Sequence, residues 1–351
     1  MAQINKPTDY FNTKLYTGTG SQLAVTGVGF QPDWIWYKNR GTSNSHGVQD
    51  VVRGFNTTGI QSTNGTDADP AFNGSTLGYV SAVGSDGFTV EAGNCANASS
   101  NTYVAWNWLA GGSASSNTDG SITSTVSANQ TAGFSIVSYT GTGSNATVGH
   151  GLGVAPNVVI VKQRTASGNH WVMYNSVLPS ANYFLYLDNT DPQQTATGFF
   201  NNTAPTSSVF TVGTDAQTNG NTNSLISYCF AEKKGYSKFG SYTGNGNDDG
   251  TFVYTGFKPA FVMSKCTSHA GEDWNINDNK RPGYNVIQNA LLPNSTSAEV
   301  TASYQAVDTL SNGFKWRGSN DRVNASGKTY IYMAFAENPL VGTNNIPATA
   351  R

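Results

Sequence analysis

The sequence predicts an all-β protein of three tandem β-sandwich-like repeat units, each of about 100 residues, which is close to the commonest domain size. Two observations lead to this prediction: a composition rich in turn residues, and a sequence pattern that occurs three times. Charged residues form only 11% of the 351 residues, well below the roughly 25% of ordinary soluble domains, while glycine occurs 39 times. Glycine and asparagine suit tight turns, and threonine, valine, tyrosine and phenylalanine suit strands, so the composition is typical of strands joined by many turns.

The repeated pattern has three marks in a fixed order. It opens on Tyr-Thr-Gly-x-Gly, continues through a proline turn into an apolar strand that ends in lysine, and closes on a second apolar strand that ends in an aromatic residue. The opening and closing residues are, in order, Tyr16 and Trp108, Tyr139 and Phe230, and Tyr242 and Phe335. The opening and closing marks lie 92, 91 and 93 positions apart, and such constant spacing predicts three copies of one structural unit.

The central strand of each copy is apolar on both faces, which predicts a strand that lies between two layers. In the first copy this strand runs from Trp34 to Lys38, and its tryptophans align with ordinary hydrophobic residues in the other copies. Because Trp34 aligns with Val158 and Phe261, we expect a buried core position at all three places.

The spacing also predicts the domain boundaries. The three units span residues 1–112, 132–235 and 236–351. Residues 113–131, which are rich in Gly, Ser, Thr and Asn, are predicted to form a flexible linker between the first two units. The connection between the second and third units is much shorter, so we expect these two units to move as one body.

Residue spacing identifies no catalytic, cofactor or metal site, and we expect a protein that is not an enzyme and uses no cofactor. Asp273 begins a polar run that is similar to a calcium loop, but Asp278 and Tyr284 stand where such a loop needs glycine and glutamate, so a strand explains the run better. Trp171 and Trp274 share a position after the central strand; stacking on sugar rings is one interpretation, and the shared position favours a structural role. A pair of carboxylates for glycoside cleavage would meet only in space, so the sequence leaves that possibility open.

Several long phrases resemble one family of tandem-repeat virion proteins. They are PTDYFNTKLYTGTG, VGFQPDWIWYKNR, GFSIVSYTGTG, CFAEKKGYSKFGSYTGNG and YIYMAFAENP. This family is encoded by tailed bacteriophages, notably of marine bacteria and cyanobacteria, and its members are labelled tail-fibre or receptor-binding proteins. The resemblance extends from Pro7 to Pro339 and carries over no catalytic or binding residue.

The resemblance implies a non-enzymatic virion surface protein, a tail fibre or similar adhesin, that binds the host cell envelope through a surface polysaccharide or a protein receptor. It also implies contacts with other virion proteins of the tail, baseplate or capsid, and assembly into a homotrimer, which would protect exposed sheet edges. A net charge of −2 predicts no nucleic-acid partner, and the absence of a run of roughly 18 apolar residues predicts no membrane insertion. A place on the virion, with synthesis in the bacterial host cytoplasm and release by lysis, fits the polar N-terminus, which has no secretory signal.

Two alternatives stay open beside the adhesin. The first repeat begins without a long preceding shaft, which leaves room for a capsid decoration or baseplate protein that has no receptor affinity. A tailspike that hydrolyses surface glycan is the enzymatic alternative.

A receptor site is predicted on the third unit, in the stretches where the copies differ. Binding residues commonly lie on loops that a rigid scaffold holds, and the shared strands are committed to the core. Basic residues gather here in an otherwise charge-poor chain, and together with one tryptophan they would suit the phosphate or carboxylate groups of a polysaccharide. The predicted receptor-binding residues are Lys280, Arg281, Lys315, Trp316, Arg317, Arg322 and Lys328. The alternative is a scatter of solvated charges that keeps the unit soluble.

Overall fold

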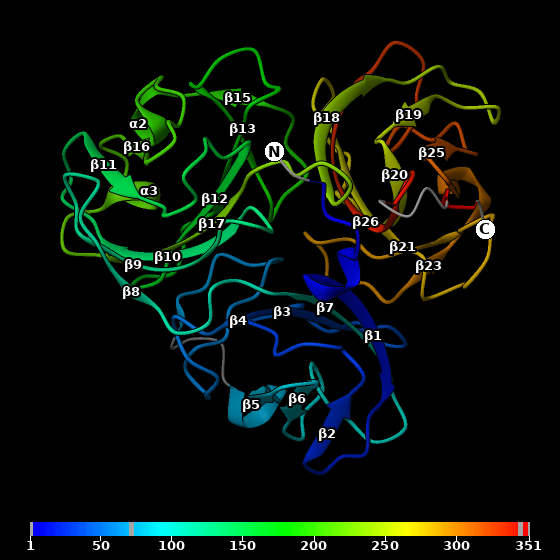
Figure 1. The fold of residues 1–351 in the computed structure, drawn as a ribbon, viewed down its shortest axis with the longest axis horizontal. Helices are drawn as coiled ribbons and strands as arrows, with labels where there is room; N and C mark the ends of the chain where they lie inside the picture. Colours follow the sequence, from blue (N-terminus) through cyan, green and yellow to red (C-terminus); the bar gives the residue numbers. More distant parts are fainter. Residues whose placement is uncertain (1–2, 70–73, 343–346, 350–351) are drawn as a thin grey trace.

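The computed structural model describes residues 3–69, 74–342 and 347–349, and antiparallel strands build nearly all of it (Figure 1). The predicted all-β fold is confirmed. The described helices are only three or four residues long, and none of them has the length or the apolar character to cross a membrane.

The first segment, residues 1–112, forms two sheets. Its elements are η1 (Pro7–Asp9), β1 (Phe11–Thr17), β2 (Leu23–Thr26), β3 (Trp34–Asn39), β4 (Gly47–Asp50), α1 (Gly74–Leu77), β5 (Val80–Gly84), β6 (Gly87–Val90) and β7 (Thr102–Trp108). The inner sheet has the order β1-β7-β3-β4, and a smaller outer sheet has the order β2-β6-β5.

The second segment, residues 113–235, has the largest sheet. Its elements are β8 (Ser115–Asn117), β9 (Ser124–Asn129), β10 (Phe134–Thr140), β11 (Ala146–Gly149), β12 (Val158–Gln163), β13 (Trp171–Asn175), β14 (Tyr183–Tyr186), β15 (Gln194–Thr195), α2 (Thr197–Phe200), β16 (Val209–Val212), α3 (Ala216–Asn219) and β17 (Ser224–Phe230). The inner sheet has the order β15-β14-β13-β12-β17-β10-β9-β8, and β11 pairs with β16 outside it.

The third segment, residues 236–351, again has an inner sheet, with the order β18-β26-β20-β21, and an outer sheet, with the order β19-β25-β24. Its elements are β18 (Ser237–Thr243), β19 (Phe252–Tyr254), β20 (Phe257–Cys266), β21 (Asn275–Asp278), β22 (Asn289–Ala290), β23 (Val300–Thr301), η3 (Ser303–Gln305), β24 (Val307–Leu310), β25 (Gly313–Trp316) and β26 (Thr329–Pro339). The pair β22 and β23 forms a separate small sheet.

One strand order occurs in all three inner sheets. The strand of the opening tyrosine pairs with the closing strand, the closing strand pairs with the central strand, and the central strand pairs with a fourth strand. The residues that face each other across the central and closing strands are Trp34 and Trp108, Val158 and Phe230, and Phe261 and Phe335. All six are buried, so the expectation of a core position at Trp34, Val158 and Phe261 is confirmed.

The three inner sheets share one central hydrophobic cluster, where the lobes of Figure 1 meet. The ring centroids of Trp34 and Tyr228 lie 4.7 Å apart, those of Phe11 and Phe335 lie 5.3 Å apart, and those of Phe230 and Phe335 lie 5.8 Å apart. Aromatic pairs at such distances stabilise a core beyond the area they bury. The first segment is therefore packed into the same body as the second and third.

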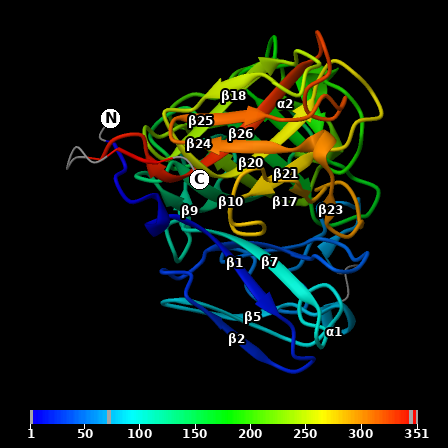
Figure 2. The same ribbon diagram turned by 90° about the vertical axis from the view of Figure 1, so that its right-hand side faces the viewer.

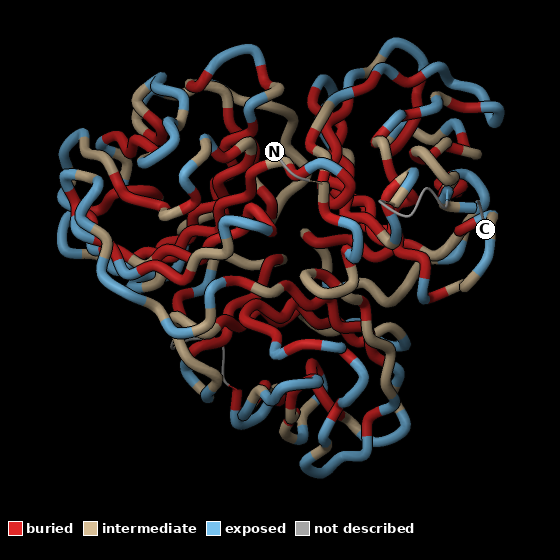
Figure 3. The backbone as a smooth tube through the Cα atoms, in the orientation of Figure 1, coloured by how far each residue is buried: buried red, intermediate tan, exposed pale blue. Residues whose placement is uncertain are grey.

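Each inner sheet also packs on its outer face, where its own segment supplies a second, peripheral cluster. Figure 2 shows the inner sheets of the first and third segments as separate layers, and Figure 3 shows buried backbone along the inner strands and exposed backbone at the rim. The loops at the rim are thus carried by sheets that are packed on both faces.

The predicted linker at residues 113–131 is wrong, because this stretch contains β8 and β9. The two strands form a hairpin, and β9 pairs with β10 along the edge of the inner sheet. Ile122 and Val126 are buried in the peripheral cluster of the second segment. Serine and threonine occupy the exposed positions of this edge hairpin, so its composition is similar to that of a linker although its backbone is paired.

The repeated Tyr-Thr-Gly-x-Gly has a structural explanation. In the second segment, the hydroxyl of Tyr139 donates to the carbonyl oxygen of Thr218 at 2.6 Å, and Oδ1 of the next residue, Asn219, accepts from the backbone N–H of Thr142 at 2.8 Å. The amide nitrogen of Asn219 also donates to the Ser144 carbonyl on the far side of the turn. The same clamp occurs in the other two segments: the hydroxyls of Tyr16 and Tyr242 donate to the carbonyls of Ala96 and Val323, and the next residues, Asn97 and Asn324, accept from N–H groups of the turn.

The packing of three segments against one another also bears on assembly. The homotrimer was expected partly because three small units would expose their sheet edges. In the structure, the units already pack against one another within one chain. The homotrimer stays a prediction of the resemblance alone.

Candidate functional site

The predicted basic receptor site does not form as expected on the third segment. Trp316 is fully buried in the peripheral cluster, and the Arg281 side chain is completely buried between carboxylates. Neither residue can contact a receptor, so the prediction is wrong for both. Both residue types can also be buried. An aromatic side chain suits a core, and an arginine can be buried when carboxylates from distant loops pair with it.

Most of the other predicted cations are neutralised by carboxylates. Asp249 pairs with Lys315 at 2.6 Å and with Arg317 at 3.2 Å, and the Lys315 ammonium lowers the pKa of this carboxyl. Other carboxylates complete the pairing: Arg317 contacts Asp308 at 2.6 Å, and Arg322 contacts Asp273 at 2.8 Å. Lys280 is exposed and Lys328 is partly exposed. The seven predicted residues therefore build no continuous basic surface.

The polar contacts between the segments involve corresponding positions of the three inner sheets. We call the contact of the first and second segments junction A, that of the first and third junction B, and that of the second and third junction C. At junctions A and B, a residue of one closing strand donates a hydrogen bond to the carboxylate at the end of the neighbouring sheet's fourth strand. The positions that correspond in the three sheets follow from the strand registers.

At junction A, a buried arginine joins two carboxylates. The Tyr228 hydroxyl donates to Oδ2 of Asp50 at 2.8 Å, and Nε of Arg53 donates to the same oxygen at 2.5 Å. The Arg53 side chain also lies 3.5 Å from Asp69, which accepts from Arg164 at 2.5 Å. Burial alone would lower the pKa of Arg53, but the two carboxylates raise it above its usual value, so the guanidinium stays charged.

Junction B repeats this arrangement with other residues. Nε1 of Trp106 donates to Oδ2 of Asp278 at 3.0 Å, and Nε of Arg281 donates to the same oxygen at 2.7 Å. Arg281 also donates to Glu299 at 3.1 Å, and Glu299 pairs with Arg40 at 3.0 Å. The pKa of Glu299 is lowered by the two arginines in spite of its burial.

Junction C has neutral residues at the same positions. Asn175 takes the place of Asp50 and Asp278, and Leu178 takes the place of Arg53 and Arg281. The backbone N–H of Gln193 donates to the Thr267 carbonyl at 3.0 Å. The corresponding backbone bonds run from Asp69 to Arg164 and from Glu299 to Arg40, so Gln193 and Thr267 replace an acid and an arginine.

A pocket of about 450 Å³ lies at junction C, and Leu178, which takes the place of the two arginines, is one of the residues that line it. Its apolar wall includes Leu178 and Pro179, and its polar wall includes Thr243 and Thr329 with Gln193. The residues that line it are Val177, Leu178, Pro179, Gln193, Ser241, Tyr242, Thr243, Thr267, Thr329, Tyr330 and Ile331. None of these lining residues is charged, and several at its mouth are exposed. The pocket can therefore accept a molecule with both hydroxyl groups and apolar faces.

A second pocket of about 450 Å³ lies where the chain passes from the second segment to the third. The exposed ring of Tyr254 lines it, as do Glu232 and Lys238, which form an ion pair at 2.8 Å. This pocket is charged where the pocket at junction C is neutral.

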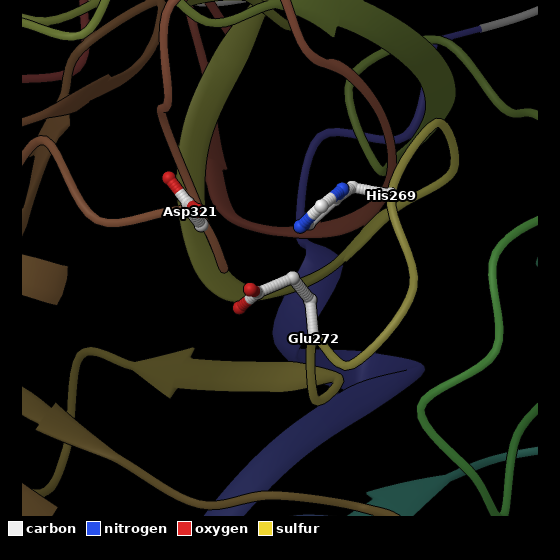
Figure 4. A group of neighbouring side chains, drawn as sticks. All are labelled: His269, Glu272 and Asp321. Carbon is white, nitrogen blue, oxygen red and sulfur yellow. The ribbon is translucent and has the colours of Figure 1, made fainter.

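One cluster of ionisable side chains gathers at the rim of the third segment. Figure 4 shows His269, Glu272 and Asp321 pointing toward one another, and their ligand atoms all lie within 4.8 Å. Burial and the neighbouring Asp321 carboxylate raise the pKa of Glu272. The cluster offers the donor types of a divalent cation site, and it also brings together two carboxylates that the sequence could not pair.

The tryptophans that were considered as sugar platforms are structural. Trp171 and Trp274 are buried, and the indole N–H of each donates at 2.8 Å to a backbone carbonyl of the neighbouring segment, Ser62 and Tyr186 respectively. Asp273 precedes a buried strand, β21, as the interpretation against a calcium loop predicts.

Each central strand ends in a buried lysine. These residues are Lys38, Lys162 and Lys265, and burial lowers the pKa of each to about 8. Nζ of Lys265 donates to the Cys266 carbonyl at 2.9 Å and reaches the Thr190 carbonyl of the second segment at 3.4 Å. A lysine that donates hydrogen bonds to backbone carbonyl groups in this way has a structural role and not a catalytic one.

The family model described as "Domain of unknown function (DUF7483)" matches residues 6–339, which is nearly the whole chain. No protein in the curated set matches the chain.

Proposed function

Because the chain belongs to the DUF7483 family, whose description assigns no activity, we propose its function from the residues and the fold: a virion surface protein, a tail fibre or similar adhesin, that binds the host cell envelope. The resemblance of its long phrases to tandem-repeat proteins of tailed bacteriophages supports this proposal. The low charge and the all-β architecture suit a protein that must persist outside a cell.

The architecture supports a binding role because it separates a rigid scaffold from variable surface. Three inner sheets share the central cluster, and each has a peripheral cluster on its other face. Loops on such a scaffold are held in place without being part of the core, which is how many binding proteins position their contact residues. Ordered loops also lose less conformational entropy when a ligand binds.

The single observation that carries the proposal is the difference among the junctions. At junctions A and B buried ion pairs occupy the positions that Asn175 and Leu178 take at junction C, and junction C keeps a neutral pocket of about 450 Å³ between two segments. The smaller pocket at junction A, of about 280 Å³, is lined by the charged pair Asp69 and Arg164. Ligand sites occur preferentially at such contacts between domains, and a volume in this range suits a small ligand or one unit of a larger one.

The test combines location with binding. Antibodies against the purified protein are applied to intact virions, with gold labelling viewed by electron microscopy, and fluorescent protein is applied to the bacterium on which the virus grows. Label on the tail together with saturable cell binding supports the adhesin. Label on the capsid shell without cell binding would instead identify a decoration protein, and absence of label from virions would contradict a virion role.

A second candidate, a glycan hydrolase, is favoured by one specific observation. Oxygen atoms of Glu272 and Asp321 lie within 4.8 Å, and retaining glycosidases hold their two carboxyl groups roughly 5 Å apart. The raised pKa of Glu272 suits a general acid. Release of reducing ends from host polysaccharide by the wild type, and its loss in Glu272→Gln, would support this candidate, and no release would exclude it.

A further inference from the structure

We propose that the pocket at junction C binds an uncharged sugar ring, one pyranose unit of an envelope glycan. This inference rests on the host-binding function proposed above and names the site and the ligand class. It replaces the basic site that the sequence predicted with a neutral one between the second and third segments.

The other two junctions show what the pocket would contain if it had only a packing role. There the fourth strand is followed by an arginine whose side chain is completely buried against a carboxylate, Arg53 with Asp50 and Arg281 with Asp278. At junction C the corresponding pair is Leu178 and Asn175. Leucine is shorter than arginine and carries no charge, and Leu178 lines the pocket of about 450 Å³.

At junction C, neutral residues replace the charged residues at all four corresponding positions. The acid and the arginine on the facing loops, for example Glu299 and Arg40 at junction B, become Gln193 and Thr267. A single uncompensated charge in such a site would be costly, so the four positions change as a set. The outcome is a pocket whose whole lining is neutral.

The lining chemistry selects the ligand. The hydroxyl group of Thr243 and the amide of Gln193 can each donate or accept, which suits sugar hydroxyls. The Thr329 hydroxyl lies 3.0 Å from that of Thr267, and its second hydrogen-bonding position can serve a ligand. Among the described residues, the Gln193 side chain has no hydrogen-bonding partner, so its amide is available to a ligand. Leu178 and Pro179 present the apolar surface on which the C–H face of a pyranose can lie. A phosphate, sulfate or carboxylate would have to lose its hydration without finding a cation, so charged sugars are excluded.

The first experiment measures binding of single sugars to the purified full-length protein. Glucose, galactose, mannose and N-acetylglucosamine are tested by saturation-transfer difference NMR and titration, beside glucuronic acid and galactose 6-sulfate. We expect saturable binding of at least one uncharged sugar and none of the two charged ones. Binding of only the charged sugars, or of none of the six, would overturn the proposal.

The second experiment fills the pocket with the residues that the other junctions use. Leu178→Arg with Gln193→Glu recreates the Arg281 and Glu299 pair, and we expect sugar affinity to fall at least tenfold. Thr243→Trp, at the exposed mouth, blocks the pocket without touching the buried residues and gives an independent reading if the double variant does not fold. Tyr254→Ala is the matched control in the charged pocket and should bind as the wild type does.

The outcomes distinguish a wrong site, a wrong ligand class and a wrong function. Sugar binding that survives in both filled variants but is lost in Tyr254→Ala assigns the sugar to the other pocket and overturns the inference. Wild-type protein that binds host cells but none of the sugars contradicts the ligand class and leaves the adhesin function standing. Wild-type protein that binds sugar but no host cell contradicts the adhesin instead.

Discussion

Replacing Arg281 with leucine tests whether a buried ion pair and a neutral pair are interchangeable at corresponding positions of the junctions. The change leaves the buried Asp278 without its cation and Glu299 with only Arg40. Removing one partner of a buried ion pair costs about 3–5 kcal/mol of unfolding free energy, because a charge stays buried and unpaired. For a chain of 351 residues this corresponds to a fall in Tm of roughly 4–7 °C.

The double variant Asp278→Asn with Arg281→Leu recreates at junction B the pair that junction C already has, Asn175 and Leu178. No buried charge is left unpaired at this position, so we expect a total cost of only about 1–2 kcal/mol, below that of the single variant. Adding Asp278→Asn should thus recover about 2–3 kcal/mol of the stability that Arg281→Leu alone loses.

Urea unfolding followed by tryptophan fluorescence measures these free energies. Lys280→Ala, at an exposed neighbour, is the control and should stay within about 0.5 kcal/mol of the wild type. Equal destabilisation of the single and double variants would refute the reasoning, because the cost would then come from lost packing and not from the stranded carboxylate.

Three further predictions concern the clamp, the buried lysines and assembly. Tyr139→Phe should cost about 1–2 kcal/mol and Asn219→Ala about 2–4 kcal/mol in the same assay, because Asn219 holds both sides of the turn; a larger cost for Tyr139→Phe would contradict the clamp. The pKa of Lys162 is about 8 in the folded protein and about 10.4 when unfolded, so between these values the unfolded state binds more protons and stability rises with pH. The difference in unfolding free energy between the wild type and Lys162→Met should therefore change in favour of the wild type from pH 8 to pH 10. A change in favour of the variant over this range would contradict the prediction. Light scattering should find the homotrimer that the resemblance implies, and a stable monomer at micromolar concentration would count against it.

The sequence predicts the all-β class and the central core because both depend on patterns that lie close together in the chain. The strand that begins at Trp34 carries apolar residues on both of its faces, and a strand between two layers accommodates this. The same reasoning fails for residues 113–131, where serine and threonine on the exposed positions of an edge hairpin give the composition of a linker.

The candidate site could not be predicted in the same way, because its residues meet only in space. Arg281 was expected at the surface, and it is buried by Glu299, whose place beside Arg40 depends on how distant segments pack. A signal was nevertheless present: Asp-x-x-Arg follows the fourth strand in the first and third copies, at 50–53 and 278–281, and Asn-x-x-Leu follows it in the second. An asparagine that stands six residues before a closing-strand residue in every copy, such as Asn219, was likewise visible in the sequence.

The central claim is that junction C is where this protein contacts the host. Fluorescent wild-type protein and the Leu178→Arg, Gln193→Glu variant, matched in thermal stability, are titrated onto cells of the bacterium on which the virus grows. The account predicts that the filled variant binds these cells at least tenfold more weakly than the wild type. Equal binding by the two proteins would contradict it.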